Sequence, residues 1–204
     1  VIVAALQSVI DAHARSTAKA DVWTPRTFAI PADAKATPVV IAVWDSGVDL
    51  SLFKPAAGRG LAFDENAQPA KDLLRPLGEA ESRWPQLRSL IKGAMDQRAA
   101  LDTPDSQRLR ATMAGLKADQ VKGFSEDMAL TGLYVHGTHV AGIAVEGNPF
   151  AQVFAGTMLW SAKTEPAKPS EALARARAAS YQTMVEAFKT AKVRVVNMSW
   201  RYGP

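Results

Sequence analysis

The sequence has no cysteine and only three histidines among its 204 residues. Without cysteine there can be no disulfide bond, no thiolate metal ligand and no cysteine nucleophile. Polar residues interrupt the apolar runs, so none looks long enough to span a bilayer. The apolar opening at residues 1–6 has no basic segment before it and is followed by Gln7 and Asp11, so it does not resemble a signal peptide.

The charge pattern gives no indication of nucleic-acid binding. The formal net charge is only +4, and a DNA-binding surface needs basic residues on one face with polar or aromatic readers between them. Late in this sequence the basic residues instead alternate with alanines, which is typical of a solvated helix face; they are Lys163, Lys168, Arg175, Arg177, Lys189, Lys192 and Arg194. We therefore expect no nucleic-acid partner.

Alternating strand and helix patterns predict the fold class. Val39–Trp44 is a continuous apolar run after a proline, as in a strand buried on both faces of a parallel sheet. Further strands are predicted within 153–162 and over 193–200, and helices over 136–147 and after Ser170 as N-cap. Because 48% of the residues are apolar, the chain can bury a core. We expect an α/β fold, a three-layer, mostly parallel sheet flanked by helices.

The sequence divides into a lead-in segment and one main domain. Residues 1–37 contain a predicted amphipathic helix at 2–15, followed by a stretch that prolines interrupt. Residues 38–204 are expected to form the domain, which a helical insertion interrupts at about 52–130.

Within the insertion, local signals predict two helices outside the sheet. Residues 52–78 look irregular. One helix is expected to begin near Ser82, and the second has Thr103 as its N-cap with Pro104 at the first helical position. Both apolar stripes are narrow, so each helix needs a partner, and residues 82–116 are predicted to form a helical hairpin.

An aspartate, Asp45, follows the predicted buried strand directly, and Ser46 and Gly47 turn the chain there. In an open parallel sheet, catalytic groups gather at the carboxyl ends of the strands. The pattern therefore makes Asp45 a candidate catalytic carboxylate. The alternative is an ordinary turn-forming aspartate, since Asp-Ser-Gly is common turn chemistry.

His136 is a candidate general base at the start of the helix predicted over 136–147. The positive end of a helix dipole disfavours the imidazolium and leaves a neutral ring that can accept a proton. Gly137 is expected to allow close backbone approach, and Gly142 to make room for tight packing. The alternative, for an isolated histidine, is a capping or core residue.

His139 adds a metal-binding alternative, because it lies three residues after His136 on the same helical face. Gly137, however, occupies the position where the H-E-x-x-H pattern of zinc proteases has its glutamate. Two histidines and a distant aspartate are an incomplete zinc site, so we expect no metal ligand in the sequence.

Three segments resemble the motifs of the subtilisin-like serine proteases, the subtilases of peptidase family S8. Asp45–Val48 is similar to their aspartate motif, His136–Gly142 to their histidine motif, and Val195–Ser199 to the strand that lines their substrate cleft. In subtilisin the catalytic residues follow in the order aspartate, histidine, serine, and this sequence has the first two in that order. The resemblance implies the N-terminal part of a subtilase catalytic domain.

The resemblance also implies roles for individual residues. Asp45 would orient His136 and stabilise its imidazolium, and His136 would accept the proton of a serine that attacks a peptide bond. Ser199, Trp200 and Arg201 would contact a peptide or protein substrate, which would pair with the strand by β-augmentation. Calcium is a candidate cofactor by family resemblance only, since the sequence has no acidic cluster with loop spacing. The family also suggests an extracytoplasmic location, secreted or periplasmic.

Two departures from the subtilase pattern affect the expected function. Arg201 stands where the family usually has a glycine, so we expect an altered primary specificity pocket. The separation of Asp45 and His136 is about three times the roughly thirty residues found in subtilisin. The extra residues, mainly 82–116, are expected to restrict substrates or to contact a regulatory partner; surface decoration is the alternative.

The subtilase serine motif, Gly-Thr-Ser-Met-Ala, is absent from the sequence. We therefore expect a serine endopeptidase that acts through an acyl-enzyme, present as a fragment whose serine and oxyanion-hole asparagine lie beyond Pro204. The fragment alone should hydrolyse no peptide. One alternative is a catalytically inactive subtilase-like domain that binds peptides or partners. The other is a helical interaction module with coincidental motifs, in which Asp45 does not contact His136.

Overall fold

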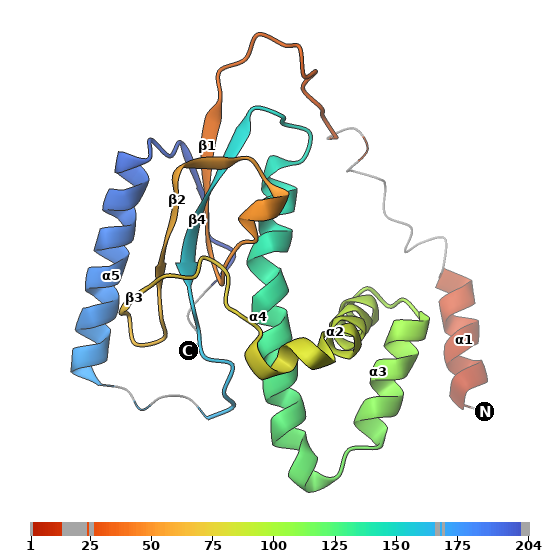
Figure 1. Cartoon of the computed structure of the whole chain (residues 1–204). Coiled ribbons are helices and arrows are strands. Elements are labelled where there is room, and N and C mark those ends of the chain that lie inside the picture. The colour runs from red at the N-terminus through yellow and green to blue at the C-terminus, as the bar shows by residue number, and fades with distance from the viewer. Residues whose placement is uncertain (1, 14–23, 25–26, 166–167, 169, 201–204) are drawn as a thin grey trace.

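The computed structural model describes residues 2–13, 24, 27–165, 168 and 170–200. Its centre is a five-stranded sheet in the order β3-β2-β4-β1-β5 (Figure 1). The strands are β1 (Val39–Asp45), β2 (Pro55–Phe63), β3 (Pro69–Ala70), β4 (Ala151–Met158) and β5 (Val195–Asn197). All neighbouring pairs are parallel except β2 with β3, so the predicted α/β fold with a mostly parallel sheet is confirmed.

Strand β1 lies between β4 and β5. Its pairing with β4 runs from Val39 opposite Ala151 to Asp45 opposite Thr157, and residues 41–45 are buried. A strand with helices on both sides of its sheet buries both of its faces, which explains the continuous apolar run in the sequence. The carboxyl end of β1 is therefore held by neighbours on two edges and two faces.

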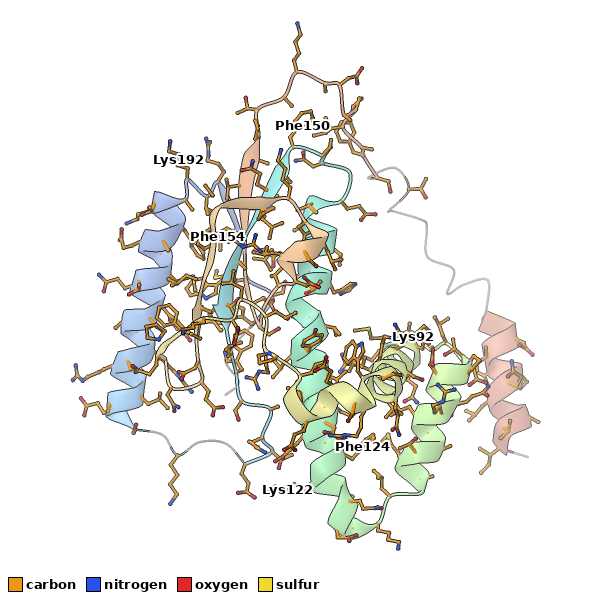
Figure 2. The ribbon with its side chains drawn as sticks, viewed as in Figure 1. Lys92, Lys122, Phe124, Phe150, Phe154 and Lys192 are labelled. Atoms are coloured by element: carbon orange, nitrogen blue, oxygen red, sulfur yellow. The ribbon has the colours of Figure 1, made fainter. Side chains whose placement is uncertain are left out.

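Helices cover both faces of the sheet (Figure 1). On one face, α5 (Glu171–Thr190) buries Met184 in a cluster with Phe154 of β4, which Figure 2 labels. On the other face, α4 (Val121–Val145) contributes Ala141 to a second buried cluster. These two clusters form the core, and they place α4 beside the carboxyl end of β1.

The region predicted to be irregular, residues 52–78, contains β2 and β3, so that prediction is wrong. Strand β2 is rich in glycine and alanine and has neither an alternating nor a continuous apolar pattern. A side-chain Cβ at Gly60 would overlap the carbonyl oxygen of Ala155, so the two backbones approach closely there. A strand built on glycine leaves little hydrophobic signal in the sequence.

The two ends of the chain follow the sequence predictions with shorter bounds. Helix α1 (Ile2–His13) exposes its apolar residues, and residues 14–15 of the predicted helix lie outside the described residues. Ser170 caps α5 as predicted and accepts a hydrogen bond from the backbone N–H of Leu173 at 3.1 Å. The last predicted strand, 193–200, is confirmed only over β5.

The predicted helical hairpin is present as α2 (Trp84–Arg98) and α3 (Pro104–Ala114), preceded by a 3₁₀ helix, η3 (Gly78–Arg83). Thr103 caps α3, and its hydroxyl accepts a hydrogen bond from the backbone N–H of Ser106 at 3.2 Å. Pro104 occupies the first helical position as predicted. Local capping signals therefore predicted this pair of helices correctly.

Helix α4 begins at Val121, about four turns before His136, so the predicted helix start at residue 136 is wrong. Another 3₁₀ helix, η4 (Ala118–Gln120), leads into it from the hairpin, and one more, η2 (Leu50–Leu52), follows the turn after β1. The insertion therefore ends inside the helix that carries His136, without a loop between the two.

Residues Ala118–Val145 are also long and apolar enough to cross a membrane, judged by length and composition alone and only among the described residues. The sequence-based expectation of no such run missed this segment. Helix α4, which makes up most of this segment, packs against β1 and against α2.

Candidate active site

Asp45 is the last residue of β1 and its side chain is fully buried. Its Oδ1 atom accepts a hydrogen bond from the backbone N–H of Ser46 at 2.7 Å. The Ser46 hydroxyl oxygen lies 3.0 Å from the same atom, and its single proton is shared between Asp45 and the carbonyl oxygen of Leu133. The other oxygen, Oδ2, has no hydrogen-bond partner among the described residues. A buried carboxylate is costly unless it is paired, so this position favours a cationic or strongly donating neighbour.

His136 supplies that neighbour. Its Nδ1 atom lies 2.7 Å from Asp45 Oδ1, although the two residues are 91 positions apart. The His136 side chain is 46% exposed while that of Asp45 is 0% exposed, so one edge of the ring faces the buried carboxylate. Because a carboxylate accepts, Nδ1 carries the proton and Nε2 of the neutral ring is left able to accept one. The predicted Asp45–His136 contact is present, and the coincidental-motif alternative, which required its absence, is contradicted.

Two glycines bring the ring and the carboxylate together. Gly47 turns the chain after β1 with a φ of 128°, which favours glycine. A Cβ at Gly137 would overlap the carbonyl oxygen of Gly47, so α4 rests directly on the turn, as predicted. Gly142 is different, because a Cβ built there meets no described atom within 4 Å apart from its chain neighbours and the adjacent backbone of its own helix. The prediction that Gly142 makes room for tight packing is therefore wrong.

Two further hydrogen bonds join the turn to α4. The Ser46 hydroxyl donates to the carbonyl oxygen of Leu133 at 2.6 Å, and the backbone N–H of Asp49 donates to the Thr138 hydroxyl at 3.0 Å. They bracket His136 in the sequence. Neither contact was predicted from the sequence, where Ser46 and Thr138 stand out only as members of the two motifs.

The electrostatic setting of His136 differs from the predicted one. Helix-terminal fields fall off within the first turn, and His136 lies near the middle of α4. The argument from a helix N-terminus is therefore wrong for this residue. The fully buried Asp45 carboxylate is instead the charged group in contact with the ring.

The predicted substrate strand lies beside the same end of β1. Val43 of β1 is opposite Asn197 of β5, and Ser199 follows two residues later, where its hydroxyl donates to Asn197 Oδ1 at 2.8 Å. Ser199 is thus at the carboxyl edge of the sheet, as is Asp45. Arg201 lies outside the described residues, so its predicted effect on the specificity pocket stays a prediction.

Trp200 packs into an aromatic cluster at this edge. Its ring centroid lies 5.5 Å from that of Trp44, 5.8 Å from that of Trp160 and 6.1 Å from that of Tyr181. Its indole N–H donates to the carbonyl oxygen of Trp44 at 2.6 Å. The indole is therefore fixed against β1.

Metal ligands do not converge in the described part of the chain. No group of three or more histidine, aspartate or glutamate side chains there could hold an ion, and His136 already directs Nδ1 to Asp45. The described residues therefore offer no cluster of histidine and carboxylate ligands, and no chemical step is assigned to a metal. A serine hydroxyl bonded to His136 is likewise absent from the described residues.

Comparison with protein-family models matches residues 36–202 to the subtilase family, Peptidase S8. The matched range begins just before β1 and contains the insertion, Asp45 and His136. Comparisons with curated proteins and with solved structures find no match. The family match covers well over half of the chain and agrees with the sheet and with the contact between the two motifs, so the chain belongs to the subtilase family.

Proposed function

We propose that the chain supplies the general base and its orienting carboxylate for a serine endopeptidase that hydrolyses peptide bonds through an acyl-enzyme. The observation that supports the proposal is the 2.7 Å contact between His136 Nδ1 and the fully buried Asp45 carboxylate. Membership of the subtilase family supports hydrolysis of peptide or protein substrates. An extracytoplasmic site of action, secreted or periplasmic, is part of the same proposal.

In the proposed mechanism His136 Nε2 removes the proton of a serine hydroxyl as the oxygen attacks the substrate carbonyl. The imidazolium that forms is stabilised through Nδ1–H by Asp45, and it then protonates the leaving amine as the C–N bond breaks. Water attacks the resulting ester, with His136 again taking and returning the proton, and the acid product leaves. Asp45 holds the tautomer in which Nε2 is free and remains ionised throughout.

The nucleophile in this proposal is a serine outside the 204 residues, because the sequence contains no Gly-Thr-Ser-Met-Ala motif. Ser46 is a poor substitute, since its hydroxyl contacts Asp45 and Leu133. Ser199 bonds to Asn197. Ser199 and Trp200 are proposed to contact the substrate backbone beside β5, and the insertion is proposed to contact a regulatory partner.

The test compares this chain with the same chain joined to a serine-bearing subtilase segment. The chain alone should neither hydrolyse casein nor react with a fluorophosphonate probe, whereas the joined form should do both. In the joined form, His136→Ala should lower kcat about 10⁶-fold and Asp45→Asn about 10⁴-fold. Turnover by the chain alone that disappears in Ser199→Ala would place the nucleophile here. A folded joined form that binds peptides without cleaving them would favour the inactive binding domain.

A further inference from the structure

The hairpin insertion contacts α4 next to His136. The ring of Trp84, at the start of α2, meets the ring of Tyr134 edge to face, with centroids 5.1 Å apart and an interplanar angle of 67°. Tyr134 lies two residues before His136, so the two side chains leave α4 in different directions. One turn of α4 therefore presents His136 to the sheet and Tyr134 to the insertion.

The contact between insertion and helix extends over several turns. Arg83 of η3 forms an ion pair with Asp127 of α4 through both guanidinium nitrogens. A Cβ built at Gly132 would lie 3.8 Å from Ile91 of α2. In Figure 2, Lys92 marks α2 and Lys122 marks the beginning of α4 in this region.

The contacts of α4 with the turn after β1 lie at the same level of the helix as its contact with Trp84. Ser46 bonds to the carbonyl oxygen of Leu133, and Gly137 rests on Gly47. The helix is thus held from the sheet side at residues 133 and 137 and from the insertion side at Tyr134. Two sets of contacts on different sides of one helix resist both sliding of the helix and rotation about its axis.

We propose that the insertion is a brace for the candidate catalytic histidine, and that Trp84 is a positioning residue that acts on His136 through Tyr134. Without the brace, α4 would be held near His136 by the sheet side alone. A small rotation would then lengthen the distance between His136 Nδ1 and Asp45, and displacements of about 1 Å are enough to lower catalysis roughly a hundredfold. The effect of the brace on catalysis rests on the proposed function, whereas its effect on the distance between His136 and Asp45 does not.

The experiment measures the Nδ1 proton of His136 in the 204-residue chain by NMR, with no substrate present. A proton shared with a carboxylate gives a separate downfield resonance, which His136→Gln identifies by its loss. Trp84→Ala should make this proton exchange with water roughly three to ten times faster, the change expected from loss of one aromatic pair. Leu101→Ala is the matched control, because Leu101 is an exposed apolar residue of the hairpin, and it should change nothing. Trp84→Phe should restore most of the wild-type rate.

Equal exchange rates in folded Trp84→Ala and Leu101→Ala would overturn the proposal. If Trp84→Ala does not fold, Arg83→Gln and Arg110→Gln decide the question. Both remove an exposed arginine–aspartate pair, but Arg83 bonds to Asp127 of α4 and Arg110 to Asp102 beside α3. Faster exchange only in Arg83→Gln supports the brace, and equal rates contradict it. A chain that shows the brace effect but gives no active joined enzyme would contradict the proposed function alone.

Discussion

At the scale of single residues, Gly137 and Gly142 show that two glycines of one motif serve different purposes. Both lie in α4, and glycine inside a helix costs about 1 kcal/mol relative to alanine. At Gly137 the cost is offset because only glycine permits the contact with Gly47. At Gly142 the described surroundings leave open space, so nothing in the described structure offsets it.

Substitution of the two glycines by alanine should change the free energy of unfolding in opposite directions. Gly142→Ala should raise the free energy of unfolding by about 0.5–1 kcal/mol through helix propensity alone. Gly137→Ala should lower it by about 1–3 kcal/mol, because the added methyl overlaps the Gly47 carbonyl. Urea unfolding of the two variants measures both values. A Gly137→Ala variant as stable as wild type, with its His136 Nδ1 resonance unchanged, would contradict the packing described for the turn.

The residues of the candidate site also show what the sequence alone could establish. Asp45 and His136 were identifiable because each lies in a motif with a characteristic neighbourhood. The hydrogen bonds of Ser46 to Leu133 and of Thr138 to Asp49 were not. They depend on the direction in which α4 crosses the turn after β1, and short-range patterns do not encode that direction.

At the scale of elements, local signals predicted some boundaries and failed at others. The hairpin was predictable because Thr103 and Pro104 form a complete start signal. The length of α4 was not, because the segment Gly132–Val135 resembles a strand or loop and packing against α2 overrides that preference. Strand β2 was missed because its first six residues contain two glycines, two alanines and an arginine, which give little hydrophobic signal.

Because the contacts of Trp84 and Ile91 with α4 lie before His136, removal of the hairpin should have a local effect. Replacing residues 84–116 with a short flexible linker should leave β1 and β4 protected from amide hydrogen exchange. The residues of α4 before His136 should exchange at least about tenfold faster, since they lose the contacts of Trp84 and Ile91. Hydrogen-exchange mass spectrometry resolves these segments. Loss of protection in β1 and β4 would show that the insertion belongs to the core.

At the scale of the whole molecule, several carboxylates outside the sheet have a lowered pKa because each accepts a hydrogen bond from a lysine. Hydrogen bonding to Lys163 lowers the pKa of Glu126, and hydrogen bonding to Lys122 lowers the pKa of Glu165. In the hairpin, Lys92 lowers the pKa of Asp96 in the same way. These groups belong to the insertion, to α4 and to the segment after β4, whereas the buried clusters of the sheet are apolar.

Acid should therefore loosen the insertion and the first half of α4 before it unfolds the sheet. A carboxylate whose pKa is lowered in the folded state contributes stability above its ordinary pKa of about 4, and this contribution is lost as the pH falls through the folded value. NMR spectra recorded from pH 7 to pH 3 should show chemical-shift changes and broadening of hairpin and α4 amides below about pH 4, while amides of β1 and β4 keep their positions. Addition of 0.5 M salt at pH 7 should weaken the same contacts, because screening reduces the attraction between exposed charges. Simultaneous loss of sheet and hairpin signals at one pH would contradict this prediction. It would show that the hairpin, α4 and the sheet unfold as a single cooperative unit.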